Sequence, residues 1–274
     1  MNITENLLLK GIISAYKAGE EILKIYLSNN FEIETKKNET PLTIADKNSH
    51  AIIYQLLSKT NIPILSEEGK EIPFDIRKNW EYFWLIDPLD GTKEFINKNG
   101  EFTVNIALIK NNSPIMGIIY SPVLKDLFFG SESIGSYKLI NLPDKINKVK
   151  NNVELLINKS EKILTSNKSE NLRIVVSRSH MSKETEDYIN LIKNKYKAVE
   201  YTSIGSSLKL CMIAEGKADI YPRFGPTMEW DTAAGHAIAK YAGCSITLTD
   251  GKTNLIYNKE NLLNPYFLVK SKKY

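Results

Sequence analysis

Four short apolar segments, separated by turn sequences, constrain the fold of this chain more than any other feature. They cover residues 82–86, 102–109, 115–120 and 127–130, and the connections between them include Asn-Asn-Ser-Pro and Ser-Pro. Such connections favour tight turns. The first segment is almost entirely apolar, which is typical of a strand buried on both faces. The pattern predicts a run of adjacent antiparallel strands.

Helices and further strands are predicted on either side of this run. Apolar residues at helical spacing predict a first helix that runs from Leu8 to about residues 28–30. Residues 31–35 and 63–66 are predicted strands, with a helix over 43–59 between them. Beyond the four strands, the pattern predicts alternating strands at 174–177, 219–221, 245–248 and 266–269 and helices at 183–193, 206–215 and 231–241.

This change of pattern divides the chain into two expected halves. Residues 1–140 are expected to form an N-terminal α+β half, and residues 141–274 a C-terminal α/β half, packed as one compact unit. The junction is expected in the stretch 141–170, which is rich in Asn, Lys and Ser. Strands and helices in both halves favour a layered α/β fold.

Composition argues against several classes of protein. No segment approaches the ~20 apolar residues that a membrane span needs, and the N-terminus does not resemble a secretory signal. The net charge of +4 is not gathered in a basic stripe or motif, as a nucleic-acid-binding protein would show. Cys211 and Cys244 lack the spacing of a zinc site or a disulfide framework, so we expect buried free thiols.

Carboxylates gather where predicted strands end and helices begin. The first apolar strand runs into Asp87-Pro-Leu-Asp90-Gly-Thr92, although Asp, Pro and Gly in this order are also typical of an ordinary turn. Glu67 and Glu68 follow the strand at 63–66, where a solvent-exposed turn is the alternative. Asp231 stands where a helix is predicted to begin, where it could simply cap that helix. Such positions are also where α/β proteins place ligand sites.

Together these residues fit metal-assisted phosphate hydrolysis. Carboxylate oxygens and a backbone carbonyl are the ligands that Mg²⁺ prefers. Backbone N–H groups at Gly91-Thr92 and at the start of the Asp231 helix could bind phosphate. Because carboxylates alone repel phosphate, divalent cations must mediate, for example two ions ~3.5–4 Å apart.

Three motifs, in the same order along the chain, resemble the signatures of the inositol monophosphatase superfamily. They are Glu67, the segment 87–92, and Trp230-Asp231-Thr-Ala-Ala-Gly235. The similarity extends from the first helix to residues 263–265 and is weakest over 141–170. It implies a sandwich of alternating helix and sheet layers. Further stretches resemble bacterial 3′(2′),5′-bisphosphate nucleotidases of the CysQ type, namely 65–68, 92–95, 100–107, 176–180, 203–209 and 222–226.

The resemblance implies roles for individual residues. Thr92 and Asp46 would bind the attacking water and, with Glu67, form the catalytic set. Without the resemblance, Asp46 would be taken for an exposed helical residue. Glu68 matches the ligand position less well than Glu67. The implied metal ligands are Glu67, Asp87, Asp90, Asp231 and the backbone carbonyl of Leu89.

Substrate-binding residues are expected mainly in the second half. Ser206 and Lys209 are one helical turn apart, and Arg223 follows a predicted strand. They match, in spacing, nucleotide-binding positions of the related nucleotidases, although two surface cations are the alternative. Lys209 and Arg223 could contact a 5′-phosphate, which an inositol monophosphate lacks. Further contacts are expected from Gly91, Thr92, Asp231, Ser177 and His180, of which the last two would line the adenosine side.

The resemblance implies hydrolysis of 3′-phosphoadenosine 5′-phosphate to AMP and phosphate, with phosphoadenylyl sulfate (PAPS) as a second substrate. It also implies two or three Mg²⁺ ions, sensitivity to Li⁺ and a place in sulfur metabolism. An inositol or sugar phosphatase and a non-catalytic, metal-binding regulatory relative are the alternatives. We expect a cytoplasmic monomer or homodimer that binds a small nucleotide and no nucleic acid; loose association with the inner face of the cytoplasmic membrane is left open.

Overall fold

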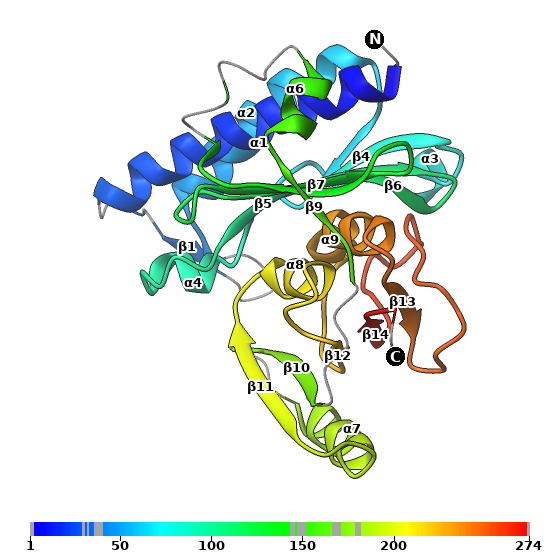
Figure 1. Cartoon of the computed structure of the whole chain (residues 1–274). Helices are drawn as coiled ribbons and strands as arrows, with labels where there is room; N and C mark the ends of the chain where they lie inside the picture. The colour runs from blue at the N-terminus through cyan, green and yellow to red at the C-terminus, as the bar shows by residue number, and fades with distance from the viewer. Residues whose placement is uncertain are drawn as a thin grey trace.

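Alternating layers of helices and sheets make up the molecule (Figure 1). The computed structural model describes residues 3–28, 31, 33–35, 41–142, 146, 152–165, 171–178 and 182–272. From one side to the other, the layers are helices α1 and α2, a seven-stranded sheet, helices α8 and α9, a five-stranded sheet, and helix α7. The predicted sandwich of alternating layers is confirmed.

The seven-stranded sheet has the strand order β3-β4-β5-β6-β7-β8-β9. Strand β3 is parallel to β4, and each later neighbour is antiparallel. The predicted run of antiparallel strands is therefore confirmed, and β8 and β9 extend it. The strands are β3 (Ile64–Ser66), β4 (Tyr82–Asp90), β5 (Thr103–Lys110), β6 (Ser113–Ser121), β7 (Asp126–Ser131), β8 (Gly135–Leu139) and β9 (Glu161–Ile163).

Two helices, both predicted from the sequence, cover the outer face of this sheet. Helix α1 (Ile3–Ser28) packs against α2 (Ile44–Leu57) and against β5 and β6, and α2 also packs against β4. The apolar face of α1 buries Ile12, and that of α2 buries Ile53, in the same core as Trp84. Short elements lie at the edges of this half: β1 (Glu34–Thr35), β2 (Pro41–Leu42), η1 (Ser58–Thr60), α3 (Phe74–Arg77) and α4 (Thr92–Ile96).

Helix α9 (Glu229–Tyr241) lies between the two sheets beside α8 (Leu208–Ala214). It packs on the inner face of the seven-stranded sheet through small residues, among them Ala234. Gly117 on β6 allows this approach, because a Cβ added there would lie 2.1 Å from the carbonyl oxygen of Ala234. Backbone contact with the sheet therefore fixes the position of α9.

The five-stranded sheet has the order β11-β10-β12-β14-β13. Its first three strands are parallel, and β14 runs antiparallel between β12 and β13. Helix α7 (Lys183–Lys193) covers the outer face of this sheet (Figure 1). The strands are β10 (Leu172–Ser177), β11 (Val199–Ile204), β12 (Ile220–Arg223), β13 (Ser245–Leu248) and β14 (Phe267–Lys270).

The expected junction at 141–170 contributes α6 (Val153–Asn158) and β9 to the outer helix layer and to the seven-stranded sheet. Helix α6 buries Val153 and Leu156 in the core that α1 and α2 share. Strand β9 joins the first sheet, so the chain passes between sheets after Ile163. A boundary at residue 140 would separate β9 from its sheet, and the division into halves remains a prediction.

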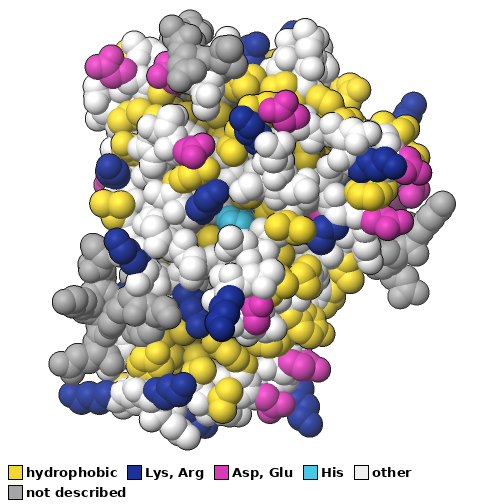
Figure 2. Space-filling model, turned by 90° about the vertical axis from the view of Figure 1, so that its right-hand side faces the viewer, with side chains coloured by type: hydrophobic (Ala, Val, Ile, Leu, Met, Phe, Trp, Pro, Cys, Tyr) yellow, Lys and Arg dark blue, Asp and Glu magenta, His cyan; other side chains and the backbone are white. Residues whose placement is uncertain are grey.

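Two further expectations concern the surface and the thiols. None of the helices described here is long and apolar enough to pass through a bilayer. Basic side chains are scattered among acidic and apolar ones on the face shown in Figure 2. Cys211 and Cys244 are buried and form no disulfide, as expected.

Candidate active site

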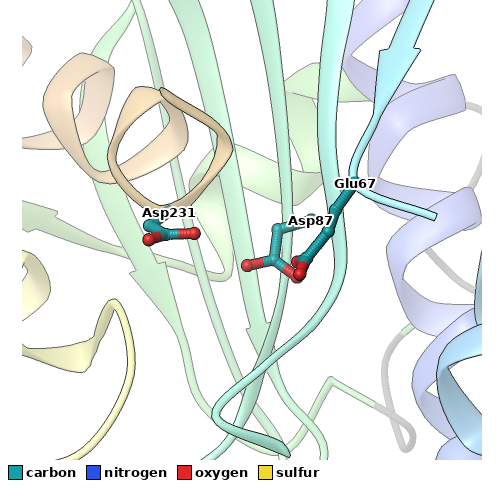
Figure 3. Close-up of side chains that lie close together, drawn as sticks. All are labelled: Glu67, Asp87 and Asp231. Carbon is teal, nitrogen blue, oxygen red and sulfur yellow. The ribbon is translucent and has the colours of Figure 1, made fainter. Parts of the chain in front are cut away.

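Three carboxylates meet at one edge of the seven-stranded sheet. Because β3 and β4 are parallel neighbours, their carboxyl ends share this edge. Glu67 follows β3, and its N–H donates to the carbonyl of Ile86 at 3.1 Å, which places it beside Asp87. Asp231 reaches the same point from the first turn of α9 (Figure 3). One oxygen from each of Glu67, Asp87 and Asp231 lies within 4.8 Å of the others.

An irregularity in β4 separates the two aspartates of the Asp-Pro-Leu-Asp motif. The pairing with β5 shifts register between Asp87 and Asp90, so β4 continues to Asp90 with a bulge in place of the simple turn. The N–H of Leu89 donates to Asp87 Oδ1 at 3.1 Å. The hydroxyl of Ser49 on α2 donates to the carbonyl of Pro88 at 2.7 Å. These two bonds fix the bulge against the outer helix layer.

Asp90 lies outside the group of three carboxylates. Its Oδ2 accepts from the backbone N–H and from the hydroxyl of Ser207, both at 2.6 Å. The side-chain amide of Asn105 also approaches this oxygen, at 3.2 Å. Asp90 nevertheless lines the same cavity as the three carboxylates.

The three clustered carboxylates repel one another. Burial raises the pKa of Asp87 well above its usual value, and the neighbouring charges of Glu67, Asp90 and Asp231 raise it further. Burial likewise raises the pKa of Asp231, with Asp90 and Glu67 adding to the effect, while the hydrogen bond from the N–H of Met228 opposes it. A divalent cation bound among these oxygens would offset the repulsion, and all-oxygen donors suit Mg²⁺ or a similar hard ion.

Asp46 and Thr92 form a hydrogen-bonded pair beside this cluster. Thr43 caps helix α2, and its backbone N–H and hydroxyl donate to Asp46 Oδ2 at 2.7 and 2.6 Å. The hydroxyl of Thr92, at the start of α4, donates to Asp46 Oδ1 at 3.3 Å. Asp46 is only 1% exposed, so the alternative of an exposed helical residue is wrong.

A cavity of about 510 Å³ opens between the two sheets next to the carboxylates. Its second wall comes from the carboxyl ends of the parallel strands: Ser177 ends β10, Gly205 follows β11, and Arg223 ends β12. Ligand sites of α/β proteins commonly occupy this position. The predicted residues that line the cavity are Glu67, Asp87, Leu89, Asp90, Gly91, Thr92, Ser177, Ser206, Lys209, Arg223 and Asp231.

Two buried cations also line this cavity. Lys209 and Arg223 are each 7% exposed, which excludes the alternative of two surface cations. Burial lowers the pKa of Lys209 to about 8; Asp90 opposes this shift and Arg223 adds to it. Arg223 donates from Nη2 to the carbonyl of Pro226 at 2.8 Å, while its buried Nε has no hydrogen-bond partner within the described part of the chain. An unsatisfied buried donor at a cavity wall suits an anionic ligand.

The structure adds residues that sequence reasoning missed. Glu94, Ser207 and Leu263 also line the cavity, and Asn105 contacts Asp90 from β5. Ser207 and Leu263 fall inside the stretches that carry the resemblance, but nothing in their local sequence indicates a role. His180 lies outside the described residues.

Comparison with known proteins agrees with this geometry. The model of the inositol monophosphatase family matches residues 6–273. The chain is 41% identical over 264 residues to the 3′(2′),5′-bisphosphate nucleotidase CysQ of Salmonella typhimurium, covering 93% of this chain and 96% of the relative. It is 42% identical over 264 residues to the protein of the same name from Buchnera aphidicola, covering 92% and 89%.

A solved structure extends the agreement to three dimensions. The crystal structure of CysQ from Bacteroides thetaiotaomicron, described as a bacterial member of the inositol monophosphatase family, is 47% identical in sequence. It superposes with a TM-score of 0.89 and covers 99% of both chains. From its sequence, its layered fold and its carboxylate cluster, this chain belongs to the inositol monophosphatase family.

Proposed function

We propose that this protein is a phosphomonoesterase that hydrolyses the 3′-phosphate of 3′-phosphoadenosine 5′-phosphate, releasing AMP and phosphate. One observation carries the proposal: the carboxylate cluster and two buried cations, Lys209 and Arg223, line the same cavity. A nucleotide with two phosphates matches such a cavity, because one phosphate can bind at the carboxylates through a cation and the other at the two basic side chains. The names of the similar proteins from Salmonella and Buchnera, 3′(2′),5′-bisphosphate nucleotidase, support the same substrate class.

The donor set at the reacting end fits a hard divalent cation, which we propose to be Mg²⁺, with two or three ions. The ligands would be the carboxylates of Glu67, Asp87, Asp90 and Asp231 and the carbonyl of Leu89, all of which belong to residues that line the cavity. When bound, the cation would polarise the phosphate oxygens and lower the pKa of a water molecule.

Thr92 and Asp46 would orient the attacking water. Because Asp46 Oδ2 is held by Thr43, its Oδ1 is directed to the hydroxyl of Thr92. The hydroxyl of Thr92 donates a hydrogen bond to Asp46, so its oxygen lone pairs can accept a hydrogen bond from water. As the water oxygen bonds to phosphorus, the bond to the 3′-oxygen breaks. The proton that the water gives up offsets the proton that the 3′-oxygen takes up, so the products are the 3′-hydroxyl and phosphate. Glu67, beside Asp87, would complete the catalytic set.

Lys209 and Arg223 would bind the 5′-phosphate. The free Nε of Arg223 offers a charge-assisted hydrogen bond, which is about twice as strong as a neutral one. Ser206, Ser177 and Gly91 line the same cavity and would contribute further contacts to the substrate. PAPS carries an anionic group at the same position as the 5′-phosphate, so we propose it as a second substrate.

An inositol or sugar monophosphatase is the alternative function. It would use the same carboxylates, but its substrate would leave the buried cations without a second phosphate. A non-catalytic relative would be expected to have lost at least one member of the constellation. This chain retains them all, namely Asp46, Glu67, Asp87, Asp90, Thr92 and Asp231.

Phosphate release from 3′-phosphoadenosine 5′-phosphate and from inositol 1-phosphate, each with Mg²⁺ or EDTA, tests the proposal. We expect Mg²⁺-dependent release with a strong preference for the nucleotide, and Arg223→Ala should reduce that preference. Lys240→Ala is the matched control, because it removes one positive charge from an exposed position on α9. Preference for inositol phosphate would refute the substrate assignment, and no release from either would favour a regulatory relative.

A further inference from the structure

One oxygen of Asp90 is held by donors from two distant segments. Ser207, 117 positions along the chain, contributes both its backbone N–H and its hydroxyl, and Asn105 contributes its side-chain amide. All three reach Oδ2. The other oxygen, Oδ1, has no such anchor among the residues that the structure describes, so it is the oxygen that the carboxylate can offer to a cation.

The orientation of Asn105 is set by a neighbour on its own strand. Thr103 donates from its hydroxyl to Asn105 Oδ1 at 2.9 Å. Because a hydroxyl donor occupies the amide oxygen, the amide nitrogen must face Ser207 and Asp90. It donates to the hydroxyl oxygen of Ser207 at 2.7 Å. The contact lies in a buried setting, where Thr103, Asn105 and Ser207 are each at most 2% exposed.

Ser207 also connects Asp90 to helix α9, which carries Asp231. Its hydroxyl lies 2.8 Å from the carbonyl oxygen of Asp231. It can therefore donate its single hydrogen bond either to Asp90 Oδ2 or to this carbonyl on α9. Ser206, directly before it, has a left-handed backbone with φ of 50°. For a residue with a side chain this conformation is strained, and such strain gathers at functional sites.

We propose that Ser207, oriented by Asn105, is a positioning residue of the cation site. It holds Oδ2 of Asp90 and so directs the other oxygen toward the cation, and it ties the segment that carries Ser206 and Lys209 to the carboxylate end. The inference rests on the proposed function only in requiring a divalent cation at Asp90. Hydrogen-bonded partners behind a metal ligand typically change affinity by about 10- to 100-fold when they are removed.

Titration with Mn²⁺ alone, with free Mn²⁺ followed by electron paramagnetic resonance, tests the proposal. We expect Ser207→Ala to weaken Mn²⁺ binding by about 10-fold or more. Asn105→Ala should act in the same direction and carries the test if Ser207→Ala fails to fold. Ser136→Ala is the matched control, because its buried hydroxyl also donates to a backbone carbonyl, that of Ile238, at 2.7 Å but away from the cavity. Its Mn²⁺ affinity should stay unchanged.

A double-mutant cycle separates positioning from a general structural role. If Ser207 acts through Asp90, Ser207→Ala should weaken Mn²⁺ binding no further in an Asp90→Asn background. Wild-type affinity in Ser207→Ala, or an equal loss in both backgrounds, would overturn the proposal. No nucleotide is present in this titration, so an incorrect substrate assignment would leave its result unchanged.

Discussion

Replacing Asp87 by Asn should stabilise the metal-free protein while it abolishes activity. Asp87 is 2% exposed, and its carboxylate lies within 4.8 Å of those of Glu67 and Asp231. At this distance and an effective dielectric constant of about 20, each fully ionised pair costs about 3 kcal/mol. Because burial and these charges raise the pKa of Asp87, this group holds its proton to a higher pH than an ordinary aspartate, which relieves part of the repulsion. We therefore expect a net gain of about 1–3 kcal/mol for the amide.

Thermal unfolding in EDTA and in Mg²⁺ measures this effect. For a chain of this size, 1 kcal/mol shifts Tm by about 2–4 °C, so Asp87→Asn should unfold several degrees higher than wild type in EDTA. In Mg²⁺ at about 1,000 times its Kd the order should reverse, because the ion then stabilises the wild type by about 4.1 kcal/mol, more than the amide gains, and the variant binds it weakly. Phosphate release should fall at least about 100-fold.

The pH dependence of stability should also show that the ionised Asp87 destabilises the metal-free protein. With the folded-state pKa of Asp87 above its ordinary value of 3.8, the unfolded chain releases this proton first as pH rises. The metal-free wild type should therefore lose stability above pH of about 4, toward the raised folded-state pKa, and Asp87→Asn should lose less.

Asp219→Asn is the matched control for this change. Asp219 is equally buried, but its carboxylate accepts from Arg173 at 2.9 and 3.1 Å. The same substitution there removes a paired charge and should lower Tm in EDTA. A Tm for Asp87→Asn at or below that of wild type in EDTA would refute the argument that repulsion dominates the empty site.

Three further predictions follow from other parts of the structure. Burial lowers the pKa of Lys209 to about 8, so this side chain loses its charge above that pH. In a pH profile, KM for the nucleotide should therefore rise above pH of about 8, and Lys209→Arg should remove this rise. Thr92→Val keeps the shape but removes the hydroxyl, so kcat should fall about 100-fold while Mn²⁺ affinity is retained. Gly117→Val places a Cβ against the carbonyl of Ala234 and should destabilise the protein by about 3 kcal/mol, measured by urea unfolding, with unchanged stability as the contradicting result.

Features that depend on local sequence patterns were predicted correctly. The four apolar segments indicated β4 to β7, and the motif around Asp87 and Asp90 indicated where carboxylates would gather. The pattern did not reveal that β4 continues to Asp90, because Asp-Pro at a strand end resembles an ordinary turn. It also missed β11, a polar edge strand with four exposed residues and therefore no apolar alternation.

Other features depend on contacts between distant residues. Asp46 resembles an exposed helical residue until Thr92, 46 positions away, is placed against it. The contacts of Ser207 with Asn105 and Asp90 span 102 and 117 positions. Such contacts produce no periodic pattern in the local sequence, so they can be identified only from the packed three-dimensional structure.

The strand order also determines when this protein can begin to function during its synthesis. Strand β14 follows β12 and β13 along the chain, yet it lies between them in the interior of its sheet. Glu67 and Asp87 leave the ribosome long before Asp231, and the helix that carries Asp231 needs both sheets around it. An unfinished chain would therefore hold only part of the carboxylate cluster. Termination before α9 should yield a fragment without phosphatase activity, and removal of β14 should separate β13 from β12 in the second sheet.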